Sequence, residues 1–532
     1  MIGRKSTLAM VNVVLGSALG IVALFLAGRF FGDEAIGEMT LAFSILGILF
    51  FVTDLGMGQA HVKRVSEGRH AGDCFATYTV FKVAATGVFL LLVGASIALY
   101  TLVLGRTIED TTPAAIVFAL VYYVAKALQD IAQSSFEARV ETAKAQLSIF
   151  LDTIVRVGVT AVFAGIIAAT VSGIGPLAGR IDPDAPLVQW ARENRGSALS
   201  LATTLGGITA AGAALLMLMR AREKGRFRLE LLRDYWTFAL PLFITSTAGI
   251  VATHIDGAAL GVFLGKADAG VWGAIRRIPL VLLGVGTAVA IVLFPSISAM
   301  GARGERREIQ DAMDKALRYL SMLLVPIVTF VVLFAEPVIR IAIGADFVTG
   351  ANALRIMCIY VLVATFAYAH GTLLMGLGKP GAAARMGLLY SVLVVVLDLV
   401  LIPYDIQSLG IRLAGLGLLG AAVGTLTAGL VWYAGLRYAS YRKVGYRERA
   451  HVVRHVLGAA AMSAALLGLD RIVPFERWFH APLFALLGVT VYALALFALR
   501  ELRREDVRLI LDNVHPGEMV RYVRTELFHR RR

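Results

Sequence analysis

Charge and cysteine are both scarce in this sequence. Asp, Glu, Lys and Arg make up 17% of its 532 residues, whereas a soluble domain carries about a quarter. The two cysteines, Cys74 and Cys358, are far apart and belong to no CxxC motif, so they provide no disulfide framework. The low charge argues against an ordinary soluble protein.

Enzyme motifs are also missing. The chain has no HExxH, no GxSxG and no phosphate-binding loop. One acidic element, Asp182–Asp184 ("DPD"), falls in a loop expected outside the membrane, where a membrane glycosyltransferase would hold a metal. Its Pro-rich context, "RIDPDAP", favours a solvated turn. We predict no enzyme activity and no cofactor or metal, and keep a membrane polysaccharide polymerase or glycosyltransferase as an alternative in which Asp182 and Asp184 are essential.

Apolar residues are abundant, at 58% of the chain. They form runs of about twenty residues, the length that spans the hydrocarbon core of a bilayer. We predict an all-α polytopic membrane protein with about fourteen transmembrane helices. The first run is too long for the apolar region of a cleavable signal peptide and is expected to be a span. The expected spans are 7–28, 36–57, 76–104, 112–134, 147–171, 197–219, 236–264, 271–295, 317–335, 354–375, 384–404, 413–436, 452–469 and 481–499.

The net charge of +14 could suggest a nucleic-acid partner, but the basic residues lie between the apolar runs. If the N-terminus is cytoplasmic, the expected cytoplasmic segments hold about three times as many Lys and Arg residues as the external ones, as the positive-inside rule predicts. We therefore expect no nucleic-acid partner, a location in the plasma membrane, and both termini in the cytoplasm. Trp236, Trp272 and Trp478 are expected at span edges, in an aromatic belt.

An internal repeat divides the chain. "FFGDEAIGEM" (Phe30–Met39) follows the first expected span and "FLGKADAGVW" (Phe263–Trp272) follows the seventh. Two glycines match between the copies, Gly32 and Gly37 with Gly265 and Gly270, although two similar turns could also arise by chance. The spacing predicts a parallel duplication, with pseudo-symmetric bundles around a cavity, which is a transporter architecture. The expected parts are an N-terminal six-helix bundle (1–219), an amphipathic cytoplasmic linker (220–235), a C-terminal six-helix bundle (236–436), two appended transmembrane helices (437–499) and a basic cytoplasmic tail (500–532).

Charged residues occur inside the spans, where they are costly and by default face a cavity or a partner. Lys126 and Asp130, and likewise Asp152 and Arg156, are four residues apart and therefore share one helix face. Together with Lys82 they are expected in the inner half of the membrane. The cations could bind the phosphate of a lipid headgroup as it moves between leaflets. Alternatively, each pair is neutralised and only holds helices together.

The second half of the chain is expected to place its charges toward the outside. Arg276 and Arg277 are adjacent and diverge by about 100° around a helix, so at most one is expected to face a cavity while the other snorkels outward. His254 is more simply explained as a packing residue. The candidate coupling or ion-pair residues are Asp54, Asp130, Asp152, His254, Asp256 and Asp398.

The layout of the chain resembles a known family. Fourteen expected spans, the duplication and "DLGMGQAHVKRVSEG" after the second span resemble the Wzx-type oligosaccharide flippases of the MOP superfamily, which also contains the MATE exporters and the lipid II flippase MurJ. "GKADAGVW" and "LFPSISAM" (Leu293–Met300) are similar to that group's second-half pattern. The resemblance implies a V-shaped pair of six-helix bundles with two appended helices. It also implies that a polyprenyl-(pyro)phosphate-linked oligosaccharide is moved from the inner to the outer leaflet, for surface polysaccharide or glycoprotein assembly.

The resemblance further implies a cationic central cavity for the phosphate and sugars of the substrate. We assign it to Lys82, Lys126, Arg156, Arg276 and Arg277. The implied partners are the bilayer, the lipid-linked oligosaccharide and a glycan polymerase or glycosyltransferases. MATE exporters often carry an acid in their first span, where this chain has Asn12 and Ser17. A MATE-like cation-coupled drug or metabolite antiporter therefore stays as the alternative, with Asp54, Asp256 or Asp398 as the substitute acid.

Overall fold

The computed structural model describes residues 2–103, 112–139, 141–173, 179–219, 225–406, 411–449 and 451–502. Nearly all of this part is helical, which confirms the predicted all-α polytopic class. The strands in it are β1 (Asp405–Ile406) and β2 (Ile411–Arg412), a minimal antiparallel pair in which Asp405 faces Arg412. The predicted basic tail, 500–532, lies outside the described residues from 503 onward.

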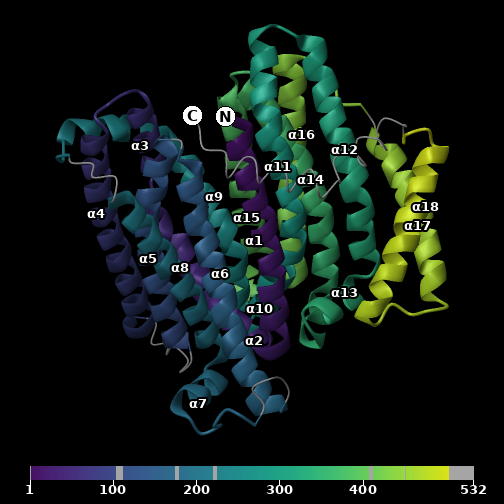
Figure 1. The fold of residues 1–532 in the computed structure, drawn as a ribbon, viewed down its shortest axis with the longest axis horizontal. Coiled ribbons are helices and arrows are strands. Elements are labelled where there is room, and N and C mark those ends of the chain that lie inside the picture. Colours follow the sequence, from purple (N-terminus) through teal and green to yellow (C-terminus); the bar gives the residue numbers. More distant parts are fainter. Residues whose placement is uncertain are drawn as a thin grey trace, which may run out of the picture.

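The first half of the chain forms one group of packed helices, coloured purple to blue in Figure 1. Helix α8 lies against α5 and α6, α1 packs on α6, and α2 packs on α5 and α8. The elements are α1 (Ile2–Phe30), α2 (Asp33–Leu49), η1 (Phe50–Thr53), α3 (Met57–Ser66), α4 (Ala71–Ala98), η2 (Leu99–Val103), α5 (Thr112–Ala138), α6 (Thr142–Ile167), η3 (Ala168–Ser172), α7 (Pro186–Glu193) and α8 (Arg195–Met219).

The second half forms another group, built around α14, which packs on α11, α12 and α16. The last two helices pair with each other and lie against α12 at the edge of the molecule, in yellow in Figure 1. The elements are α9 (Leu229–Phe263), α10 (Lys266–Ile275), α11 (Arg277–Ala302), α12 (Arg306–Leu333), α13 (Ala335–Ala342), η4 (Ala345–Gly350), α14 (Ala351–Gly376), α15 (Pro380–Leu401), α16 (Leu418–Val444), α17 (His451–Asp470), η5 (Trp478–His480) and α18 (Ala481–Ala498).

Each of the fourteen expected spans coincides with a helical segment. Among the described residues, 12 helices are long and apolar enough to cross a membrane, and a bent pair within α9 makes the number 13. The remaining expected span is α1, in which Ala18–Phe30 forms a shorter apolar helix. The apolar pattern of the sequence therefore located the spans, because the length of an apolar segment decides both the prediction from sequence and the identification of a spanning helix in the structure.

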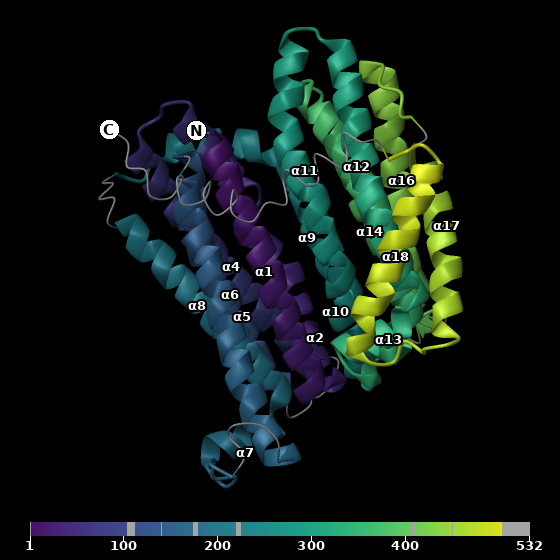
Figure 2. The same cartoon turned by 45° about the vertical axis from the view of Figure 1, so that its right-hand side comes forward.

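Apart from the first limb of α9, which packs on the first half, the two halves meet at one end of the molecule. Figure 1 shows α3 near one end and α7 at the opposite end, and we call these the α3 end and the α7 end. In Figure 2 the ribbons of the two halves lie closest near α2 and α10 and diverge toward the α3 end. Near the α7 end, the Arg29 guanidinium of α1 also donates to the carbonyl oxygens of Arg340 and Ile341, at 3.1 and 3.2 Å. This end is therefore closed by direct contact between the halves.

The repeated segments make that contact. Gly32 and Gly265 precede α2 and α10 with φ angles of 87° and 117°, a region that favours glycine. Gly37 and Gly270 lie where the two helices cross. A Cβ added to Gly37 would lie 1.7 Å from the carbonyl oxygen of Lys266, and one added to Gly270 would lie 1.9 Å from that of Asp33. The two copies thus pack on one another through their matched glycines.

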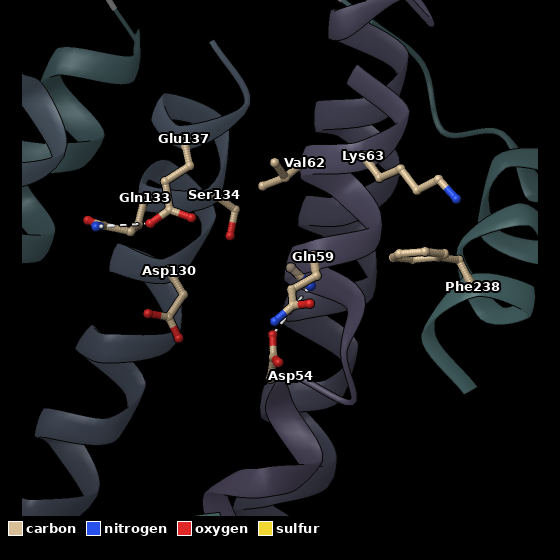
Figure 3. A pocket seen from close by; sticks show the side chains of 10 residues that line it. Asp54, Gln59, Val62, Lys63, Asp130, Gln133, Ser134, Glu137 and Phe238 are labelled. Carbon is tan, nitrogen blue, oxygen red and sulfur yellow. Dashed lines mark hydrogen bonds between the residues drawn. The ribbon is translucent and has the colours of Figure 1, made fainter. Parts of the chain in front are cut away.

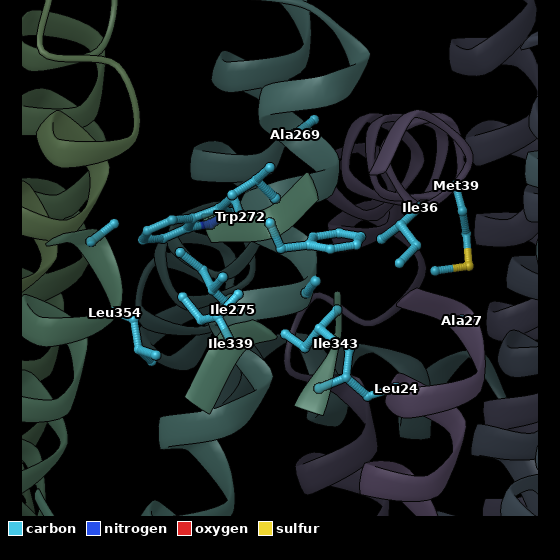
Figure 4. Close-up of a cluster of buried hydrophobic side chains, with 14 of the residues drawn as sticks. Leu24, Ala27, Ile36, Met39, Ala269, Trp272, Ile275, Ile339, Ile343 and Leu354 are labelled. Atoms are coloured by element: carbon cyan, nitrogen blue, oxygen red, sulfur yellow. The ribbon is translucent and has the colours of Figure 1, made fainter. Parts of the chain in front are cut away.

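Around this crossing lies the largest apolar core, shown in part in Figure 4. It combines side chains of α1, α2, α10, α13 and α14, including Leu24, Ile36, Trp272, Ile343 and Leu354. Trp272 is fully buried here, so the prediction that it lies in an aromatic belt is wrong. Trp272 lies inside α10 rather than at a span edge, and α10 packs between the halves. Trp236 and Trp478 are exposed, at 37% and 72%.

The chain between the halves is held against the first half. Residues 220–224 of the predicted linker lie outside the described residues, and 225–228 run without regular structure. The amide of Arg226 donates to Asp73 at 2.9 Å, and Arg228 pairs with the same carboxylate at 2.6 Å. Helix α9 then begins at Leu229 and bends by 63° between Leu240 and Leu242, at Pro241. The helical part of the predicted linker 220–235 belongs to the first limb of α9, and its place at the membrane surface stays a prediction.

Candidate functional site

The first group of predicted cations surrounds one carboxylate. Asp130 on α5 accepts Lys82 of α4 at 3.2 Å and Lys126 of its own helix at 3.1 Å. The side chain of Lys82 is only 1% exposed, and its ammonium lies 5.7 Å from the centre of the Phe50 ring. Lys126 is more open, with 37% of its side chain exposed. The i, i+4 spacing correctly predicted the Lys126–Asp130 pair, and Lys82 joins it from a neighbouring helix.

The second predicted pair also forms, more loosely. Asp152 and Arg156 on α6 are 3.8 Å apart, and α8 approaches them closely at Gly206. The charge of Lys126 reaches Asp152, so the two pairs of the first half belong to one electrostatic group. The side chain of Arg156 is 38% exposed. It is thus open to a ligand even though it has a carboxylate beside it.

The second half contributes a different arrangement. Arg276 occupies the break between α10 and α11, where it donates to both oxygens of Asp256 on α9 at 2.9 and 3.0 Å. Arg277 is exposed, and within the described ranges no ion pair or hydrogen bond joins it to another side chain. The charges of Arg156 and Arg276 both act on it. The sequence placed Arg156 and Arg277 at different membrane depths, but in the structure the charge of Arg156 reaches Arg277 from the other half.

Asp398 on α15 is the most unusual of the predicted acids. It is 0% exposed, and neither of its carboxylate oxygens has a hydrogen-bond partner in the part of the chain that the structure describes. The charges of Asp256 and Arg276 act on it, and Gly424 of α16 packs beside it. A buried carboxylate without a bonded partner is costly in its ionised form. His254 lies by Asp256 and Arg276 and packs against Gly47 of α2, as a packing histidine would.

Asp54 has a local structural role. Its two carboxylate oxygens accept the amides of Gly56 and Gly58 at 3.3 and 3.4 Å, so they cap the turn that starts α3. Leu55 and Gly56 in that turn both have positive φ angles, 47° and 79°. The acid between an apolar span and a basic helix is explained by this turn, in which a side chain replaces missing helical acceptors.

Asp54 and Asp130 also line a cavity of about 600 Å³ at the α3 end. Figure 3 shows side chains of α5 and α3 facing each other across it, while Lys63 points away over the Phe238 ring. Its other lining residues were not predicted. They are Gly58, Gln59, Val62, Lys63, Gln133, Ser134, Glu137 and Phe238.

The acidic motif Asp182–Asp184 forms a turn, since Asp182 accepts the amide of Asp184 at 3.0 Å and both side chains are exposed. Asp184 borders a second cavity of about 390 Å³ beside α7, together with Arg192 and Arg195. Within the described residues no group of three or more His, Cys, Asp and Glu side chains could hold a metal ion.

The chain is similar to proteins of glycan export. A family model described as polysaccharide biosynthesis protein matches residues 197–351. The probable low-salt glycan biosynthesis flippase Agl15 of Haloferax volcanii is 23% identical over 424 residues, which cover 80% of each chain. Among solved structures, the lipid II flippase MurJ in an inward closed conformation superposes with a TM-score of 0.69, at 15% identity, over 92% of this chain and 98% of that one.

A multidrug resistance MATE family transporter of the MOP superfamily, in an inward-facing conformation, superposes with a TM-score of 0.61 at 15% identity, over 81% of this chain and 95% of that one. This chain has the fold of the MOP superfamily. The resemblance stated from the sequence is confirmed. The matched glycines of the two repeats lie against each other, as a pseudo-two-fold relation between two like halves would place them.

Ion pairs and longer-range charge interactions link most of the predicted site residues into one series, which we call the charged path. It runs from Lys82, Asp130 and Lys126 to Asp152 and Arg156, then across to Arg277 and Arg276, and ends at Asp256 and Asp398. The sequence missed the polar lining of the 600 Å³ cavity. A signal was present, because Asp130, Gln133, Ser134 and Glu137 recur at the spacing of one helix face.

Proposed function

We propose that this protein is a flippase that moves a polyprenyl-(pyro)phosphate-linked oligosaccharide from the inner to the outer leaflet. The observation that carries the proposal is the position of Arg277, an exposed cation that has no ion-pair partner among the described residues and that feels the charge of Arg156 of the other half. Two guanidinium groups from opposite halves can hold one phosphate between them, and guanidinium binds phosphate in bidentate geometry. Similarity to Agl15 and the polysaccharide family model supports the glycan part of the substrate.

We further propose that the α3 end faces the cytoplasm, with both termini on that side and the protein in the plasma membrane. The excess of Lys and Arg in the loops expected at this end supports this orientation. The headgroup would then enter from the α3 end, where the halves diverge, while the polyprenyl tail remains in lipid.

Alternating access follows from the closed α7 end. The halves touch there through the Gly37–Gly270 crossing, so the proposed outward-open state requires α2 and α10 to separate. A phosphate held by Arg156 and Arg277 lies between the two halves and remains bound while they rock. Ion pairs such as Arg276–Asp256 keep the other cations neutralised when no substrate is present.

The proposed cycle includes no bond making or breaking, so we propose a transporter and not an enzyme. The product of such a transporter is a lipid-linked glycan in the outer leaflet. We accordingly propose that a glycan polymerase or a glycosyltransferase acts after it.

Replacement of Arg277 tests this function. In liposomes containing a fluorescent lipid-linked oligosaccharide, we expect Arg277→Gln to lower the initial translocation rate by about ten- to hundredfold, because a charge-assisted hydrogen bond contributes about 1.5–3 kcal/mol. Arg385→Gln is the matched control, since Arg385 is exposed on α15 and donates to Gly381 of its own helix. Equal rates for the wild type and both variants would overturn the phosphate-binding role of Arg277.

A second candidate function, a cation-coupled antiporter, is favoured by Asp398 and by the MATE fold similarity. A buried carboxyl with no bonded partner is suited to exchange a proton or a small cation. If transport is coupled to such an ion, Asp398→Asn should leave translocation at or below its uncoupled rate and remove its response to an imposed proton or sodium gradient. A gradient response that survives in Asp398→Asn would remove Asp398 from the coupling, and Ser391→Ala on the same helix serves as the control.

A further inference from the structure

The cavity between α3 and α5 has a chemical character distinct from that of the cationic path. Its lining includes three carboxylates, on Asp54, Asp130 and Glu137, two amides, on Gln59 and Gln133, and the hydroxyl of Ser134. Lys63 is the one basic side chain in that lining, and its ammonium lies 4.1 Å from the centre of the Phe238 ring and 3.8 Å from Glu67. The space of about 600 Å³ is in the size range of small-molecule sites.

The lining offers hydrogen-bond acceptors in excess of donors. Ionised carboxylates only accept hydrogen bonds. Gln133 donates through Nε2 to Glu137 at 3.4 Å, which leaves its carbonyl oxygen as a buried acceptor with no partner in the described part of the chain. A hydroxyl-rich ligand would supply the missing donors, whereas an anionic ligand would meet like charge.

The cavity is placed where a glycan would extend. Asp130 belongs both to its wall and to the cluster of Lys82 and Lys126, so the cavity begins where the first cations end. It lies on the α3 side of that cluster, along the α5 face that carries Gln133, Ser134 and Glu137. A phosphate held by Arg156 and Arg277 would therefore direct its attached sugars past Lys126 toward the cavity.

We infer that the α3–α5 cavity is a glycan subsite that accepts neutral, hydroxyl-rich sugars and disfavours sugars that carry a carboxylate. This inference rests on the proposed flippase function and adds the substrate class. Carboxylates and amides are suited to sugar recognition, because each accepts from a hydroxyl and rejects a ligand that leaves it unpaired. The repulsion of a uronate by Glu137 and Asp54 gives the selectivity, since Asp130 is neutralised by Lys82 and Lys126.

The test compares two lipid-linked glycans that differ at one sugar. One carries a neutral hexose, and the other carries the corresponding hexuronic acid on the same polyprenyl diphosphate. In proteoliposomes we expect the wild type to translocate the neutral lipid at least about fivefold faster. Glu137→Gln removes one repelling charge from an exposed position, so it should reduce this preference about two- to fivefold. Gln133→Leu removes the unpartnered acceptor and should slow the neutral lipid.

Glu308→Gln is the matched control, because Glu308 is an exposed carboxylate near the start of α12, at the same end but in the other half. It should keep the preference of the wild type. If the wild type moves both lipids equally, or prefers the uronate, the subsite inference is overturned while the flippase function stands. If the wild type moves neither lipid, the flippase function itself fails and the inference falls with it.

Discussion

One buried histidine outside the spans makes the stability of the fold depend on pH. His61 on α3 is buried against the Tyr78 ring, and its imidazole contacts the hydroxyls of Tyr235 and Ser135 at 3.1 and 3.3 Å. Burial, reinforced by the charge of Arg139, lowers the pKa of His61 from 6.5 to about 4. The unfolded chain binds this proton at a higher pH than the folded chain does. The histidine therefore stabilises the fold above pH 6.5, and this contribution is lost as the pH falls from 6.5 toward 4.

We expect the loss to reach about 3 kcal/mol, since one pKa unit corresponds to about 1.4 kcal/mol. Thermal unfolding of the detergent-solubilised protein between pH 7.5 and 4.5 measures it. His61→Gln keeps a hydrogen-bonding side chain that does not titrate, so its unfolding temperature should fall less steeply over this range. Parallel curves for the wild type and His61→Gln would contradict the assignment.

At the same scale, the sequence predicted contacts within a helix and missed contacts between helices. Lys126–Asp130 and Asp152–Arg156 followed from i, i+4 spacing, because a helix fixes which of its residues are neighbours. The approach of Lys82 to Asp130 and of Arg156 to Arg277 depends on how helices far apart in the sequence pack. No periodicity carries that information.

Among the helical elements, α2 and α10 make the contact that alternating access must break. We expect Gly37→Ala or Gly270→Ala to destabilise the closed α7 end by about 1–3 kcal/mol, because the added methyl group would overlap backbone of the opposing helix. Arg192 and Arg355 are replaced by cysteines that carry spin labels, and the distance between the labels is measured by electron spin resonance. In the alanine variants this distance should lengthen or its distribution should broaden. The native Cys74 and Cys358 are buried and should not react.

Gly158→Ala is the control for this prediction, since a Cβ at Gly158 would meet no atom within 4 Å. It should leave the label distances unchanged. If Gly37→Ala and Gly158→Ala give the same distances, the crossing does not hold the α7 end closed.

The limits of sequence reasoning at this scale are visible in α9 and α10. The repeat was recognised from Gly32, Gly37, Gly265 and Gly270, yet nothing in the sequence said that the copies contact each other. For the same reason the prediction for Trp272 was wrong, because tryptophan is typical of an aromatic belt but this one is buried between the halves. The docking of the first limb of α9 on the first half likewise depends on tertiary contacts, such as that of the Arg64 guanidinium with the Asp234 carbonyl.

At the scale of the whole molecule, the described part of the chain consists of two like halves that are joined at one end. A charged path lies between them. The fold class and the positions of the spans followed from apolar length, and the superfamily followed from layout. The cavity that we assign to sugars could not be predicted from the sequence. Its residues are ordinary polar side chains, and they form a cavity only because α3 and α5 face each other. Similarity to both MurJ and a MATE transporter is compatible with either a lipid or a soluble substrate. The residues of the charged path, and not the fold, therefore distinguish between these two substrate classes.

One measurement tests the central claim most directly. The wild-type protein is reconstituted into liposomes, and the appearance in the opposite leaflet of a fluorescent polyprenyl diphosphate oligosaccharide is followed over time beside the uptake of a soluble organic cation. The account predicts protein-dependent transfer of the lipid-linked oligosaccharide and no transport of the cation. Gradient-driven transport of the cation, with no transfer of the lipid above that in protein-free liposomes, would contradict it and identify an antiporter.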